Sequence, residues 1–264
     1  MSIPLRTCAE IEAVARAGRV LDGVLALGVS ACSVGTTTLD IARVMEGAIS
    51  RAGAEPILAS VRGASGPYGQ VCCISVNEEL VHSLPRRRII REGDVVSIDC
   101  AVRFPSGPEG WCVDAARAVA VGSPLSQRGT ALCAAANAVI TQTMRAAYVG
   151  GRWSSCAAAG RHAAAAMGCC LLAEYTGHGI GRILHEPPTV SYDPRSHFDF
   201  ELRPGTVFTI EPIVVEGFMP PECITLEDGW TVISSDRRWS AHAEVTVSVE
   251  TSGLKVVAGE VHLE

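Results

Sequence analysis

The chain has 264 residues, of which 48% are hydrophobic and 19% charged, and this composition excludes a disordered or collagen-like protein. Its formal net charge of −6 argues against broad binding to nucleic acid or to an anionic membrane surface. Eleven cysteines, an odd number with no C-x-x-C pair, fit a reduced cytoplasmic protein better than a secreted disulfide scaffold. We expect neither a signal peptide nor a membrane-spanning segment.

The predicted elements, taken in chain order, indicate an α+β fold. Strands and helices occur in blocks rather than in the regular alternation of a parallel βαβ protein. A capping-box pair, Thr7 and Glu10, predicts the start of the first helix. The other expected elements are a helix over 37–53, a loop over 59–69, a strand over 71–76, a hairpin of 94–103 with 111–121, Ala-rich helices over 126–148 and 154–167, and strands near 207–214, 230–233 and 243–250.

One sequence segment occurs twice. Residues 91–99 and 203–211 both read R-x-G-x-V-x-[ST]-I-[DE], and each copy ends in a carboxylate, Asp99 or Glu211. Each is followed by a strand with a second carboxylate, Asp114 or Glu244. Chance is one explanation, because short strands draw on few residue types. The other is a single catalytic domain over 1–264, made of two related halves, about 7–122 and 123–257, that share a site at their junction.

Carboxylates within apolar strands predict a metal site. An ionised carboxylate that is buried without a partner costs several kcal/mol, and four together repel one another. Two divalent cations would balance four acids, and His178, between two glycines, is the best imidazole to join them. Oxygen ligands with one imidazole suit Mn, Fe, Co or Zn. Taken singly, each acid could be a strand-edge residue and His178 a turn residue. His162, His197 and His262 are expected on the surface.

Five stretches carry a resemblance to a known family. They are ISVNEELVHSLP (74–85), GDVVSID (93–99), GHGIGRILHEP (177–187), FTIEP (208–212) and SAHAE (240–244). In this order they resemble the type I methionine aminopeptidases of the short bacterial form, over about residues 7–257. The resemblance implies the pita-bread fold, with two pseudo-symmetric halves of antiparallel sheet covered by helices. It also implies that Asp99 binds one metal, that His178 and Glu211 bind another, and that Asp114 and Glu244 bridge the two.

The activity implied by the resemblance is removal of the initiator methionine from nascent proteins that have a small second residue. A metal-bridging hydroxide would attack the first peptide bond. His185 would stabilise the oxyanion, His82 would hold the scissile amide and help to protonate the leaving amine, and Glu211 would shuttle the proton. The expected partners are the N-terminal segments of nascent proteins, met in the cytoplasm by a monomeric enzyme.

Tyr68, Cys73 and Trp230 belong, by the same resemblance, to the wall of an apolar methionine pocket. Leu184 and Ser65 stand where the family commonly has aromatic residues, so a broader-specificity dinuclear aminopeptidase remains an alternative. A non-catalytic binding protein on the same fold is a further alternative. Two other departures are a longer hairpin between Asp99 and Asp114, and a histidine, His242, in place of a neutral amide. His242 could be an extra ligand, a pH-sensitive substrate contact or a satisfied polar residue.

Overall fold

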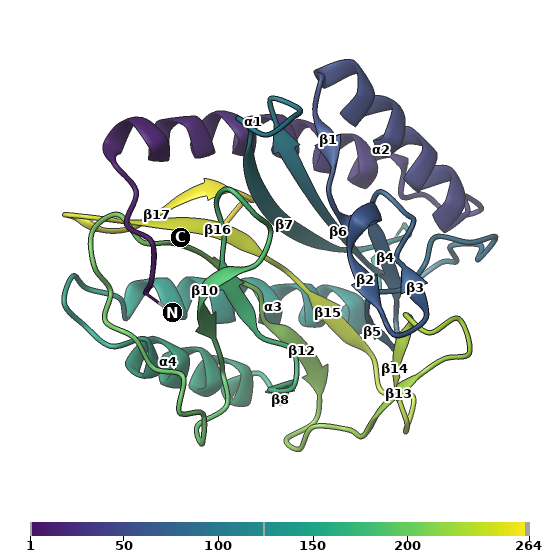
Figure 1. The fold of residues 1–264 in the computed structure, drawn as a ribbon. Helices are drawn as coiled ribbons and strands as arrows, with labels where there is room; N and C mark the ends of the chain where they lie inside the picture. Colours follow the sequence, from purple (N-terminus) through teal and green to yellow (C-terminus); the bar gives the residue numbers. More distant parts are fainter. Residues whose placement is uncertain (1, 124, 262–264) are drawn as a thin grey trace.

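A computed structural model describes residues 2–123 and 125–261 (Figure 1). In this part of the chain, two pairs of α-helices lie on opposite sides of a set of antiparallel strands, with α1 and α2 on one side and α3 and α4 on the other. The helices are α1 Cys8–Ala31, α2 Thr38–Ala52, α3 Gln127–Arg145 and α4 Trp153–Ala166, and a short 3-10 helix spans Leu58–Ser60. None of the described helices is long and apolar enough to cross a membrane.

The helix ends follow the local sequence. The Thr7 hydroxyl accepts a hydrogen bond from the Glu10 N–H at 3.3 Å, and the Glu10 carboxylate accepts one from the Thr7 N–H at 2.8 Å. At the start of α2 the Thr37 hydroxyl accepts a hydrogen bond from the Asp40 N–H at 3.2 Å, and that helix ends at Gly53, whose φ of +69° suits glycine. The four predicted helices are therefore confirmed, with bounds shifted by one to three residues.

Two larger sheets form the centre of the molecule. The predicted hairpin is confirmed as β6 and β7, which share a four-stranded sheet with β4 and β1. All the pairings between named strands are antiparallel, as the α+β class requires. The first sheet contains β1 Glu55–Pro56, β4 Cys73–Val76, β6 Val95–Phe104 and β7 Trp111–Ala120, and the second, in spatial order, β10 Glu186–Val190, β9 Gly177–Gly179, β11 Val207–Ile210, β16 Val245–Glu250 and β17 Gly253–Ala258.

Three small sheets complete the fold. They confirm the strand expected near 230–233, and they also contain strands that the sequence did not reveal, because such short segments lack a readable alternation. The predicted loop over 59–69 is likewise partly wrong, since it contains the two-stranded sheet. These sheets are β15 Ser240–His242, β12 Ile213–Glu216 and β8 Cys169–Leu171; β13 Cys223–Thr225, β14 Val232–Ser234 and β5 Glu79–Val81; and β2 Arg62–Gly63 with β3 Gly66–Pro67.

The strand expected over 207–214 is not continuous. It divides into β11 and β12, which belong to different sheets, and Glu211 and Pro212 lie at the break. A proline has no N–H for a strand ladder, so the chain leaves one sheet there and enters another. The strand expected over 243–250 begins at Val245, after a matching break between β15 and β16.

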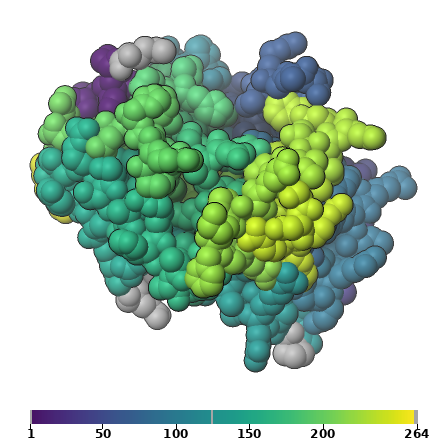
Figure 2. Space-filling model, turned by 90° about the horizontal axis from the view of Figure 1, so that it is seen from below, coloured from purple at the N-terminus to yellow at the C-terminus, as the bar shows by residue number. Residues whose placement is uncertain are grey.

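Two apolar cores stabilise the two sides of the molecule. The first lies between α1, α2 and the β6–β7 sheet, with Leu25 and Ile98 fully buried. The second lies between α3, α4 and the C-terminal strands, around Trp153 and Phe208. Most residues of the first core precede Gly122 and most of the second follow it, although the half-repeat boundaries stay a prediction. Viewed from below, the green and yellow-green segments meet across a hollow in the surface (Figure 2).

Candidate metal centre

Asp99 and Asp114 reach the same face of the first sheet because of its register. Asp99 of β6 lies opposite Ala116 of β7, and Ala101 lies opposite Asp114. Residues two apart on a strand point to the same face, as do residues directly opposite each other. Both carboxylates therefore point to one side of the hairpin, together with Cys73, which pairs with Asp99 from β4.

Glu211 and Glu244 come from a bend in the second pair of strands. Ile210 pairs with Val245 on one side of the bend, and Ile213 pairs with His242 on the other. The two glutamates therefore lie side by side, at the points where the two paired segments leave one sheet and enter another. Sequence reasoning placed them inside strands, which was wrong: it missed that the strands end beside them.

His178 is held by its neighbours in the orientation that a metal ligand needs. Its Nδ1 donates a hydrogen bond to the Gly179 carbonyl at 3.0 Å, which leaves the Nε2 lone pair free. Nε2 lies 3.6 Å from Glu211 Oε1. Thr209 Oγ1 accepts from the His178 N–H at 3.0 Å and donates to Glu211 at 2.5 Å, so one hydroxyl aligns both residues. The role of Thr209 was not predicted, although its position two residues before Glu211 is a usable signal.

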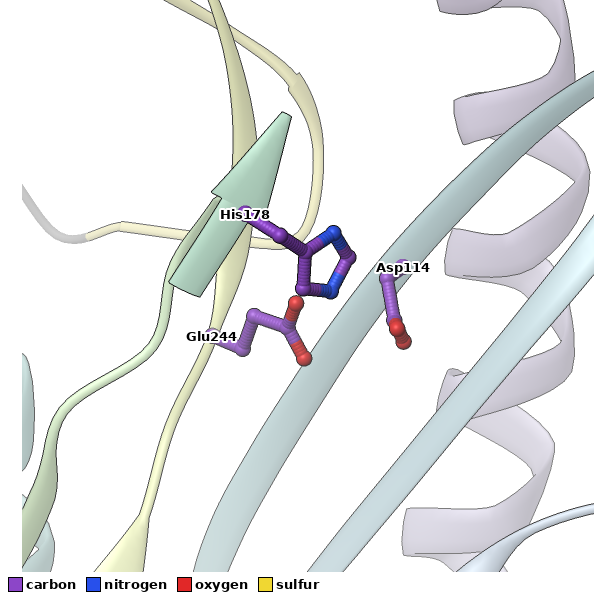
Figure 3. A group of neighbouring side chains, drawn as sticks. All are labelled: Asp114, His178 and Glu244. Carbon is purple, nitrogen blue, oxygen red and sulfur yellow. The ribbon is translucent and has the colours of Figure 1, made fainter. Parts of the chain in front are cut away.

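Several buried carboxylate oxygens near His178 have no hydrogen-bond partner in the described part of the chain, as expected for the ligands of a cation. Ligand atoms of Asp114, His178 and Glu244 all lie within 4.8 Å of one another (Figure 3). Asp99 Oδ1, Asp114 Oδ1 and Glu244 Oε1 are buried without a hydrogen-bond partner among the described residues. Buried polar atoms are normally hydrogen-bonded, so these oxygens fit metal ligands. Their charge and their chemistry, oxygen with one imidazole, suit a divalent transition metal.

The pKa values of the acids reflect the same crowding. Burial raises the pKa of Glu211 to about 8, and burial together with the Glu211 carboxylate raises that of Asp99 to about 7. Burial and the neighbouring acids also raise the pKa values of Asp114 and Glu244. Burial lowers the pKa of His178, which keeps the imidazole neutral and able to donate its lone pair.

All ten residues predicted for the site line one cavity of about 290 Å³. Several further residues that line the cavity were not predicted, because they belong to none of the sequence motifs that indicated the site. The predicted residues are Tyr68, Cys73, His82, Asp99, Asp114, His178, His185, Glu211, Trp230 and Glu244, and those missed include Leu58, Val61, Glu174, Tyr175 and Thr176.

Two more histidines border the acids. His82 has a φ of +56°, an uncommon left-handed conformation for a non-glycine residue, and such conformations concentrate at functional sites. Burial lowers its pKa, and its ring contacts that of Tyr175 edge to face. The ring of His185 lies 4.4 Å from that of His178 and is partly open to solvent. Burial, with the neighbouring His178 and His82, lowers the pKa of His185 to about 4, so this side chain is neutral at physiological pH.

The apolar wall contains Tyr68 and Trp230, whose rings meet edge to face with centroids 5.0 Å apart. The Tyr68 hydroxyl lies 3.1 Å from the Ser83 carbonyl, which fixes the ring. Leu184 lines the cavity, as expected. Ser65 is not among the described lining residues, and instead lies beside Gly229, where an added Cβ would come within 1.9 Å of its hydroxyl.

The other histidines that the structure describes do not line this cavity. His242 is buried, its N–H donates to Ser97 Oγ at 2.9 Å, and its Nε2 has no partner among the described residues. Burial and the nearby His82 lower its pKa to about 3, so it is neutral. His162 and His197 are exposed, as predicted, whereas His262 lies outside the described residues.

The fold and the acid cluster together define a class of metal-dependent peptidase. The chain belongs to metallopeptidase family M24, whose pattern matches residues 12–251. It is therefore a hydrolase that uses a divalent metal cofactor.

Within that family, the chain is similar to several methionine aminopeptidases. The chain is 34% identical to the methionine aminopeptidase of Clostridium perfringens over 248 residues, which cover 94% of this chain and 95% of the relative. It is 31% identical to that of Escherichia coli over 258 residues, with 97% and 94% covered.

Solved structures agree with this relationship. The methionine aminopeptidase of Thermotoga maritima superposes with a TM-score of 0.88 at 29% identity, and the match covers 98% of this chain and 100% of that one. The prolidase of Pyrococcus horikoshii has a TM-score of 0.73 at 21% identity, with 98% and 65% covered, and shows the shared fold alone. The expected pita-bread fold is confirmed.

Proposed function

We propose that this protein is a dinuclear-metal methionine aminopeptidase that removes the initiator methionine from nascent proteins with a small second residue. The observation that carries the proposal is the convergence of four buried carboxylates and one imidazole whose free lone pair faces them. The identity to methionine aminopeptidases over nearly the whole chain supports the same substrate.

The proposed ligand set divides the acids between two cations. Asp99 would hold one ion, His178 and Glu211 would hold the second, and Asp114 and Glu244 would be shared between the two. The unpartnered oxygens of Asp99, Asp114 and Glu244 support metal binding by these three residues. Bound cations supply Lewis-acid activation of water and of the scissile carbonyl. Mn, Fe, Co and Zn are all compatible with these ligands.

The other roles belong to the protein's own side chains. His185 is neutral and partly exposed, and donates a hydrogen bond to the oxygen of the scissile carbonyl as negative charge develops there. His82 binds the scissile amide and protonates the leaving amine. Glu211 takes up and returns the proton. Tyr68, Cys73 and Trp230 exclude water from the methionine side chain.

A relaxed side-chain preference is the second candidate, and one observation favours it. Leu184, an aliphatic residue, forms part of the cavity wall beside Leu58 and Val61. Flexible aliphatic walls can adapt to more than one apolar side chain. The broader enzyme would keep the same metal centre and differ in this wall alone.

Hydrolysis of the peptide Met-Ala-Ser tests the proposal. Turnover is expected with added Mn or Co, with loss on chelation and recovery when the metal is restored. Failure to cleave with any of the four metals would contradict the proposal and favour a binding protein on this fold. Equal cleavage of Leu-Ala-Ser would favour the broader aminopeptidase. Metal analysis of the purified protein determines the number of ions.

We also propose that the enzyme acts as a monomer in the cytoplasm. All eleven cysteines carry free thiols, as in a reducing compartment. Sedimentation of the purified protein and fractionation of the source cells test the two statements separately.

A further inference from the structure

A second cavity lies directly beside the one that holds the acids. Its volume is about 950 Å³, against about 290 Å³ for the acidic cavity. Ligand sites usually measure about 300–1,000 Å³, so the two lie near opposite ends of that range. Thr176, His178 and His185 line both cavities, which are therefore direct neighbours.

The shared wall lies where the scissile bond would sit. His178 and His185 meet edge to face, with ring centroids 4.4 Å apart, and both border the two cavities. Under the proposed function, the methionine occupies the small cavity and its carbonyl oxygen faces His185. The peptide beyond that carbonyl then leaves past His185, into the larger space.

The larger cavity has an apolar surface that is open to solvent. Ile183 is 57% exposed and Phe198 is 49% exposed. Pro187, Pro188 and Ile3 continue the same wall. Exposed apolar residues that gather beside a site commonly mark a ligand surface.

The charged groups of this cavity already have partners. Glu186 forms an ion pair with Arg6 and accepts a hydrogen bond from the Arg182 N–H at 2.8 Å. Asp199 accepts from Arg152 Nε and from the Ser154 N–H, both at 2.9 Å. Neither carboxylate is free to recognise a charged ligand, so apolar contact is left as the main source of affinity.

Recognition through added strand pairing is not favoured here. β10 is the edge strand of its sheet, but Pro187 and Pro188 lack the N–H groups that a pairing peptide would need. Side-chain contacts must then provide any preference. Phe198 is placed for this: its N–H donates to Ser196 Oγ at 3.1 Å, and its ring lies 4.2 Å from that of His197.

We propose that this second cavity, the downstream groove, binds the third to fifth residues of the substrate and prefers apolar side chains there. The groove is defined by Ile3, Ile183, Pro187, Pro188, His197 and Phe198. The inference rests on the proposed function and adds a preference to it. Among nascent proteins with the same second residue, those with apolar third to fifth residues would lose their methionine faster than those with polar residues there.

Two pentapeptides of equal length test the groove: Met-Ala-Leu-Leu-Gly and Met-Ala-Ser-Ser-Gly. We expect kcat/KM to be at least about fivefold higher for the apolar peptide, since partial burial of two leucines supplies this much. Phe198→Ala should reduce the ratio to about twofold or less, and Phe198→Leu should retain most of it. Phe218→Ala is the matched control, because Phe218 is 74% exposed and lines neither cavity.

Binding measurements separate this inference from the proposed function. Calorimetry in the presence of chelator compares the affinities of the same two peptides without turnover. If no peptide is cleaved but the affinity ratio persists and depends on Phe198, the groove stands and the proposed function fails. Two outcomes would contradict the groove while leaving the proposed function intact. Met-Ala-Ser is cleaved but the two pentapeptides have the same kcat/KM, or the ratio of their kcat/KM values is unchanged by Phe198→Ala.

Discussion

Ala116 of β7 and Glu244, which lies between β15 and β16, exchange two backbone hydrogen bonds with N···O distances of 3.2 and 3.0 Å. This bridge joins the four-stranded sheet to the C-terminal strands at the level of the acids. It holds the Glu244 carboxylate near that of Asp114, although like charges repel there when no cation is bound. Metal binding and stability are therefore coupled.

Removal of metal should make stability fall as pH rises. In the folded protein the pKa values of Asp99 and Glu211 are raised to about 7 and about 8, above their ordinary values of 3.8 and 4.5. The folded state then holds more protons than the unfolded state, so stability is lost as pH rises through 7 to 8. We expect the Tm of the chelated protein to drop by about 5 °C or more between pH 6 and pH 8.5.

The same melts with saturating Mn provide the comparison. A bound cation takes the place of the protons, so the pH-dependent loss should largely disappear. A chelated protein whose Tm is constant or rises over this range would contradict the raised pKa values.

Asp114→Asn should weaken metal binding and yet stabilise the metal-free protein. The substitution removes a buried acid that must either stay charged beside its neighbours or take up a proton that the unfolded chain does not hold at pH 8, and both cost stability. We expect metal content to fall by half or more, and the Tm under chelation at pH 8 to rise by a few degrees. Glu12→Gln, at an exposed acid of α1, is the control and should change neither value. Full metal retention in Asp114→Asn would remove Asp114 from the proposed ligands.

His185→Ala should lower kcat while both metals stay bound. Loss of one donor to a developing oxyanion typically costs about 10²–10³ in kcat. His162→Ala, on the exposed side of α4, provides the control for substitution of a histidine. The assignment is wrong if metal content collapses together with activity, because His185 would then be a ligand.

Leu184→Phe should sharpen the preference for methionine over leucine. A phenyl ring narrows the wall of the 290 Å³ cavity, and a branched side chain tolerates such a change less well than a flexible thioether. Differences of this kind are worth about tenfold or more in kcat/KM. The ratio of Met-Ala-Ser to Leu-Ala-Ser cleavage measures the effect. The control is Leu125→Phe, at an exposed leucine that does not line the cavity. An unchanged ratio would remove Leu184 from the specificity wall.

Local chemistry determines a large part of this fold and of its metal centre. The capping pair Thr7 and Glu10 marks a helix start, and the apolar runs around Asp99 and Asp114 mark a hairpin that carries buried acids. These features depend on neighbours in sequence, through capping, strand alternation and the cost of burying charge. The family resemblance adds residues, such as Tyr68 and Trp230, that no local pattern selects.

Other features depend on contacts between distant segments, and only the tertiary structure decided them. The breaks beside Glu211 and Glu244 arise because two paired strands bend together between sheets. The downstream groove exists because the segment with Phe198 folds back beside His185. Neither arrangement has a local signature, since the free energy that holds it comes from pairing and packing across long loops. The amino-acid sequence thus determines which metal-binding and cavity-lining side chains the protein has, and long-range packing determines where those side chains meet.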